Sequence, residues 1–216
     1  MRNRFDEQLF ELNRGIIEMG AMCEEAIASA AKALTTDDHR LTETVKTTGS
    51  AIDRMERDIE NRCMKLLLHQ QPVARDLHMI SAALKMITDM ERIGDQAEDI
   101  AEIAAYLNGD SSETLETISE MARVTIGMVS SSVDSFVKKD IQLAQKVIAA
   151  DDIVDDYFSK VKHDIITLIA ENRADGELAL DLLMISKYFE RIGDHATNIA
   201  EWVIYSVTGT HKEVSV

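Results

Sequence analysis

The chain has 216 residues, of which 45% are hydrophobic, and a formal net charge of −16. Its length and apolar content suit a folded protein with a substantial core and exclude an intrinsically disordered chain. The negative charge argues against direct binding to nucleic acid or anionic lipid, because both require clustered Lys and Arg.

Helical periodicity extends along almost the whole chain. Apolar residues recur at three- and four-residue steps, and 9 Gly and 1 Pro are too few for a turn-rich β fold. Short segments with capping or stop residues interrupt the pattern. The sequence therefore predicts an all-α protein whose six helices cover 4–34, 38–69, 72–107, 111–137, 140–171 and 177–207.

The second half of the chain repeats the first. "MERIGDQAEDIAE" begins at Met90 and "FERIGDHATNIAE" at Phe189, and nine of the thirteen paired residues are identical. The offset is 99 in this motif but 102 in the two preceding helices, so we expect a shorter loop before the sixth helix than before the third. Duplication of a three-helix unit predicts two tandem, pseudo-symmetric three-helix bundles, at 1–108 and 109–216.

Each copy of the motif places oxygen-bearing side chains along one side of its helix. At about 100° per residue these side chains fall within an arc of about 60°, opposite the apolar face. In the first copy they are Glu91, Asp95, Glu98 and Glu102, and in the second Glu190, Asp194, Thr197 and Glu201.

Solvation alone is the ordinary explanation of an acidic helix face. Two features indicate that solvation is not the whole explanation of these acidic faces. Carboxylates four residues apart repel each other, and no Lys or Arg lies within the arc. Gly94 and Gly193 each cost about 1 kcal/mol relative to Ala in a helix interior. Such a cost at matching positions indicates close approach of a neighbouring backbone or a bulky ligand.

A divalent or trivalent cation would turn this repulsion into attraction. Carboxylate oxygens suit iron, manganese, magnesium or calcium, and also accept zinc. One helix cannot surround an ion, so a second helix must contribute, and Gly49 at the position matching Asp151 leaves the first copy one carboxylate poorer. The predicted metal ligands are Asp53, Glu91, Asp95 and Glu102 in the first half, and Asp151, Asp155, Glu190, Asp194 and Glu201 in the second.

The sequence does not favour an enzyme. None of the 6 His has a Glu three residues before it, which excludes the usual di-iron pattern, and His195 is expected at the surface. No nucleophile–base grouping or phosphate-binding glycine loop is present. The alternative is a metal-dependent phosphohydrolase, since two metal ions can act without histidine.

The twin "ERIGDxAxxIAE" elements, with "QQPVARDL" opening the third predicted helix, resemble the PhoU family of phosphate-signalling regulators over nearly the whole chain. The resemblance implies two similar three-helix bundles side by side. It also implies metal binding through Glu91 with Asp95, Glu190 with Asp194, and Asp151 with Asp155. Gly49 and His78 depart from the family pattern.

The same resemblance implies a negative regulator of phosphate uptake and of the phosphate-starvation response. Such proteins link the ATPase of the phosphate ABC transporter to a sensor histidine kinase. It further implies a homodimer. No apolar run could insert into a membrane and no signal-peptide core is visible, so we expect a cytoplasmic protein that meets the inner membrane only through protein partners.

Overall fold

The computed structural model describes residues 2–36, 38–69, 72–107, 113–171 and 176–210. All regular structure within them is α-helical, which confirms the predicted fold class. The helices are α1 (Arg2–Ala33), α2 (His39–His69), α3 (Ala74–Ala104), α4 (Glu113–Lys138), α5 (Ile141–Ala170) and α6 (Gly176–Thr208). Their ends agree with the predicted ranges to about three residues, the usual uncertainty of helix ends. The predicted start of α4 and the boundary between 108 and 109 lie outside the described residues.

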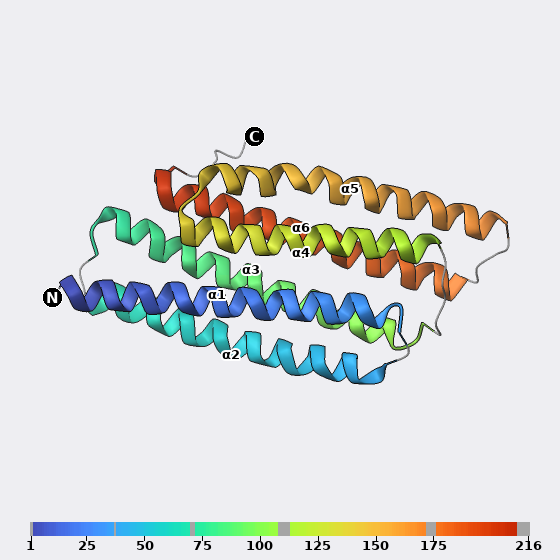
Figure 1. Cartoon of the computed structure of the whole chain (residues 1–216), viewed down its shortest axis with the longest axis horizontal. Coiled ribbons are helices and arrows are strands. Elements are labelled where there is room, and N and C mark those ends of the chain that lie inside the picture. Colours follow the sequence, from blue (N-terminus) through green and yellow to red (C-terminus); the bar gives the residue numbers. More distant parts are fainter. Residues whose placement is uncertain (1, 37, 70–71, 108–112, 172–175, 211–216) are drawn as a thin grey trace.

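The six helices form two three-helix bundles that lie side by side. α1, α2 and α3 pack against one another, as do α4, α5 and α6, and the bundles meet through α3 against α6 and α1 against α4. Corresponding helices of the two bundles run in opposite directions, so the end of α2 and the start of α3 lie at one end of the molecule, and the end of α5 and the start of α6 lie at the other (Figure 1). This arrangement confirms the predicted pseudo-symmetric pair. None of the helices in the described residues has the length and apolarity needed to cross a bilayer.

The apolar faces predicted for the two motif helices are buried. Met90, Ile93 and Ala97 on α3, and Ile192 and Ala196 on α6, are fully inaccessible to solvent. Burying these faces against the rest of each bundle supplies most of the stability of such helices, since helix propensity alone is weak. The acidic residues on the opposite sides of α3 and α6 are thereby held at the outer surface of the pair.

His195 is not at the surface, so that expectation was wrong. The residue is buried between the bundles, and its Nδ1 lies 2.9 Å from Oδ1 of Asp89 on α3. The Asn198 amide donates to the same carboxylate oxygen over 3.2 Å. Tyr188 occupies the position that matches Asp89, and its side chain interacts with Asp99 on α3. Polar contacts therefore join α3 to α6 twice.

The twin glycines allow α2 and α5 to approach the motif helices closely. A Cβ at Gly94 would lie 3.0 Å from Cδ1 of Ile52, and one at Gly193 would lie 3.4 Å from Cγ1 of Val154. Ile52 and Val154 are matching residues of α2 and α5. A neighbouring helix therefore accounts for both glycines.

The loops expected before α3 and α6 fall mostly on residues 70–71 and 172–175, which lie outside the described residues, so the expected difference in loop length stays a prediction. Within the described residues, α6 begins at Gly176, closer to Glu190 than the start of α3 at Ala74 is to Glu91.

Candidate metal centre

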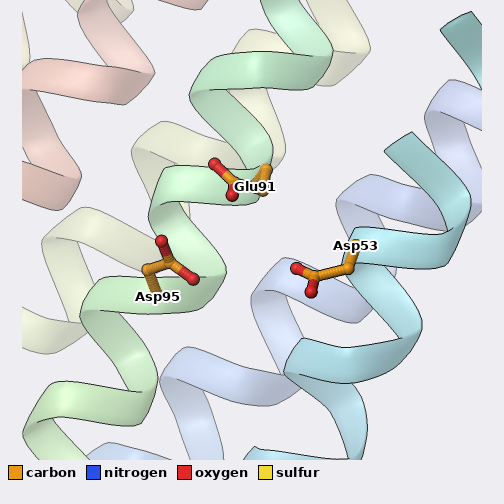
Figure 2. A group of neighbouring side chains, drawn as sticks. All are labelled: Asp53, Glu91 and Asp95. Carbon is orange, nitrogen blue, oxygen red and sulfur yellow. The ribbon is translucent and has the colours of Figure 1, made fainter. Parts of the chain in front are cut away.

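Three predicted ligands of the first half converge between α2 and α3. Asp53 on α2 faces Glu91 and Asp95, which lie one turn apart on α3 (Figure 2). One carboxylate oxygen from each residue lies within 4.8 Å of the other two. This separation leaves room for a cation between the oxygens. In the described part of the chain, no other group of three acidic, His or Cys residues is as close.

Burial and mutual repulsion make the charged form of this cluster unfavourable. Partial burial raises the pKa of Glu91, and the charges of Asp95 and Glu56 raise it further. The pKa of Asp95 is raised by burial and then by the charge of Asp53. A metal-free cluster therefore holds charges that repel each other in a partly desolvated place, and a cation would relieve this repulsion.

In the first half, the carboxylate of Glu98 on α3 lies next to Gly49, at the position where the second half has Asp151. A Cβ at Gly49 would lie only 1.7 Å from Oε1 of Glu98, so the carboxyl group of Glu98 rests directly on the α2 backbone. Its pKa is raised by burial and by the charges of Asp95 and Asp53. The matching pair in the second half is Asp151 on α5 and Thr197 on α6. At this place the carboxylate comes from α3 in the first half and from α5 in the second, so the first half also has a carboxylate there.

Glu102 belongs to the edge of the first cluster. Its Oε1 lies 3.1 Å from Nζ of Lys46, and its side chain is 57% exposed. An exposed pair of this kind contributes little to stability. The structure therefore places Glu102 at the end of the acidic row, where it is already paired with a cation.

The second half gathers Asp151, Asp155 and Asp194 between α5 and α6. Burial, which is the largest cause, and the charges of Asp194 and Asp155 together raise the pKa of Asp151 to about 6. Oδ1 of Asp151 would lie 3.4 Å from a Cβ at Gly193, so this carboxylate also rests on a neighbouring helix. Thr197 Oγ1 is buried beside Asp151 and makes no hydrogen bond of normal geometry within the described residues.

Glu190 differs from its counterpart Glu91 because it is paired with a lysine. The Lys187 ammonium group donates to Oε2 of Glu190, whose side chain is only 15% exposed. Glu201, the counterpart of Glu102, is partly buried one turn further along α6 than Thr197.

These residues fit a hard cation. The donor set of both halves consists of carboxylate and hydroxyl oxygens, which Mg²⁺, Mn²⁺ and iron prefer. In the first half Asp53, Glu91, Asp95 and Glu98 would hold the ion, and in the second Asp151, Asp155 and Asp194 would do so, joined by Glu190 if Lys187 releases it. A bound cation would supply the positive charge that these groups lack.

Sequence reasoning left Glu98 and Lys187 out of the site. Glu98 was part of the acidic row, and the absence of a side chain at Gly49 was the signal that it could reach α2. Lys187 lies three residues before Glu190, a spacing that places both side chains on one helix face.

Two segments of the chain, residues 16–104 and 118–203, match the PhoU domain. The chain belongs to the PhoU family. One matched segment lies within α1–α3 and the other within α4–α6.

Relatives support this assignment over the full length of the chain. A protein of Clostridium acetobutylicum named phosphate-specific transport system accessory protein PhoU homolog is 33% identical over 99% of both chains. One of Aquifex aeolicus with the same name is 37% identical over 86% of this chain and 84% of its own.

Two solved structures have the same fold. The crystal structure of PhoU from Pseudomonas aeruginosa superimposes with a TM-score of 0.89 at 33% identity, covering 95% of this chain and 100% of that one. The phosphate transport system regulatory protein PhoU from Streptococcus pneumoniae gives a TM-score of 0.89 at 25% identity, covering 97% and 100%.

Proposed function

We propose that the protein is a non-enzymatic negative regulator of phosphate uptake and of the phosphate-starvation response. In this proposal it is a cytoplasmic adaptor between the ATPase of the phosphate ABC transporter and a sensor histidine kinase. Full-length similarity to relatives named as accessory proteins of phosphate-specific transport supports this proposal most directly.

The acidic clusters suggest how such an adaptor would recognise its partner proteins. Carboxylates from α2 with α3, and from α5 with α6, lie at the outer surface of the two bundles, in a chain with a net charge of −16. Such a surface attracts basic patches on partner proteins and repels acidic ones. We infer that Asp53, Glu91, Asp95 and Glu98 bind a divalent or trivalent cation, which lowers this negative charge and changes which partner surface fits.

A gene deletion in the host tests the regulatory role. Without the protein, alkaline phosphatase should be expressed in phosphate-rich medium, because repression is lost. A plasmid copy of the intact gene should restore repression. Unchanged phosphatase expression after deletion contradicts the proposed regulation.

A cluster variant in the same strain tests the role of the cation. Asp95→Asn with Glu91→Gln removes two negative charges from the first cluster and should restore repression poorly. The matched control, Glu25→Gln with Asp134→Asn, removes the same charge from α1 and α4, far along the sequence from the motifs. Equal rescue by both variants would show that regulation does not depend on the cluster.

Affinity capture from membranes tests the partners. The transporter ATPase and the sensor kinase should be recovered with the intact protein. Recovery of neither would exclude the adaptor role, even if deletion altered phosphatase expression.

We further propose a homodimer and a division into bundles at 1–108 and 109–216. Sedimentation equilibrium of the purified chain measures the first, and a monomer at all concentrations contradicts it. Expression of each half alone tests the second, with helical circular dichroism as the readout.

A further inference from the structure

The two acidic clusters differ in charge at positions 56 and 88, which match positions 158 and 187. In the first half, Glu56 on α2 lies near Glu91, and Thr88 on α3 donates to Glu56 Oε1 over 3.5 Å. In the second half, Phe158 replaces Glu56 and Lys187 replaces Thr88. A carboxylate and a hydroxyl have thus been exchanged for an aromatic ring and an ammonium group, which changes the local charge from negative to positive.

Lys187 is held over the second cluster by two contacts. Its Nζ bonds to Glu190 Oε2, and it lies 5.3 Å from the centre of the Phe158 ring. A cation over an aromatic face is attracted by the ring quadrupole, which favours this position of the ammonium group. The Lys187 ammonium group therefore both compensates the negative charge of Glu190 and fixes the orientation of its side chain.

The first cluster also has cations nearby. An Arg57 guanidinium nitrogen lies 3.7 Å from Asp53 Oδ2, with the arginine side chain 68% exposed, and Lys46 pairs with Glu102, whose side chain is 57% exposed. The charge of Arg92 acts on Glu91 and Asp95, but this cation is common to both halves, since Arg191 occupies the matching position. Water and salt screen an ion pair between exposed groups more than one with a largely buried carboxylate, and of these ion pairs the one between Lys187 and Glu190 contains the most buried carboxylate, at 15% exposed. A metal ion that binds Glu190 must displace Lys187 from it.

We propose that Lys187 acts as a built-in counter-cation that keeps the metal affinity of the second cluster below that of the first. This inference rests on the proposed binding of hard cations by both clusters. A chain exposed to rising concentrations of a divalent cation then fills the first cluster, between α2 and α3, before the second, between α5 and α6. The two halves thus respond to different metal concentrations despite their common fold.

A Mn²⁺ titration tests the order of filling, with free Mn²⁺ measured by electron paramagnetic resonance. The variant Glu190→Gln/Asp194→Asn reports on the first cluster, and Glu91→Gln/Asp95→Asn on the second. The first cluster should bind about tenfold more tightly or better, a difference of about 1.4 kcal/mol. Equal affinities, or tighter binding at the second cluster, would overturn the inference. No Mn²⁺ binding in either variant or in the unmodified chain would overturn the proposed metal binding itself.

Substitutions of Lys187 in the second-cluster reporter test the cause. Lys187→Thr, which copies the first half, should tighten Mn²⁺ binding about tenfold. Lys187→Arg keeps the charge and should leave the affinity low. Lys162→Thr is the matched control, because Lys162 lies over the same Phe158 ring at 4.8 Å. An equal gain from Lys162→Thr and Lys187→Thr would show a general charge effect and overturn the role of Lys187.

The reverse exchange covers the case in which Lys187→Thr does not fold, as judged by circular dichroism. Thr88→Lys in the first-cluster reporter places an ammonium group at the matching position and should weaken Mn²⁺ binding about tenfold. Unchanged affinity in this variant would overturn the inference independently.

Discussion

The twin glycines should respond differently to alanine, although they occupy matching positions. In either helix, Ala gains about 1 kcal/mol over Gly in propensity. At Gly94 the added Cβ would meet Cδ1 of Ile52 at 3.0 Å and Cγ2 at 3.4 Å. Ile52 is fully buried and cannot move away, so overpacking should cost about 2 kcal/mol. Gly94→Ala should therefore lower the free energy of unfolding by about 1 kcal/mol.

At Gly193 the nearest atoms, Oδ1 of Asp151 and Cγ1 of Val154, would lie at 3.4 Å, an ordinary contact distance. Gly193→Ala should thus raise the free energy of unfolding, by up to about 1 kcal/mol. The difference arises from the one extra methyl group of Ile52. Replacing Ile52 by Val in the Gly94→Ala chain should then recover most of the loss, whereas Ile52→Val alone should cost about 1 kcal/mol.

Urea unfolding of the metal-free protein, followed by circular dichroism, measures these changes in free energy. The double variant supplies the coupling between the two positions, which should favour the pair by about 2 kcal/mol. If Gly94→Ala is as stable as the parent chain, or if Ile52→Val and Gly94→Ala are simply additive, then the approach of α2 is not what the glycine accommodates.

Three further results are expected. Gly49→Ala should leave the free energy of unfolding unchanged or slightly higher. It should weaken Mn²⁺ binding to the first cluster, because the added Cβ displaces the flexible side chain of Glu98. An unchanged Mn²⁺ titration would exclude Glu98 as a ligand. The pKa of Asp151 is raised from 3.8 to about 6, so the folded state binds more protons than the unfolded state between these values, and stability falls as pH rises through them. The melting temperature of the metal-free protein should accordingly be higher at about pH 5 than at about pH 7, and this difference should be smaller in Asp151→Asn. A larger difference in Asp151→Asn would refute the raised pKa of Asp151. Asp89→Ala should cost about 2 kcal/mol in urea unfolding, because His195 loses its buried acceptor, and a neutral effect would mean that water replaces the carboxylate.

The helices and the repeat were predictable because they depend on local spacing. Apolar steps along the chain fix which side of each helix is buried, and the recurrence of Gly94 and Gly193 correctly indicated close approach. The sequence also indicated that Asp53, Glu91 and Asp95 could meet, since their positions repeat those of Asp155, Glu190 and Asp194.

What could not be predicted depends on contacts between helices. His195, beside the second motif, was expected at the surface, because spacing alone does not reveal that α3 and α6 meet between the bundles. The carboxylate of Glu98 reaches α2 only because a neighbouring backbone lacks a side chain at one point. Such contacts depend on the distance between the helices and on side-chain rotamers, and the sequence alone specifies neither.

Gly49 lies opposite Glu98 in the first half, and Asp151 lies opposite Thr197 at the matching positions of the second. This difference restricts how the two halves could have diverged. Either pair can be converted into the other only through two substitutions. An intermediate with acidic side chains at both places would displace one of them from the space next to position 49, whereas glycine opposite threonine leaves that space free. Whichever pair was ancestral, the route without such crowding passes through the form in which neither helix supplies the carboxylate. On that route, one half of the duplicated protein has a depleted cluster for a time while the other half keeps its own.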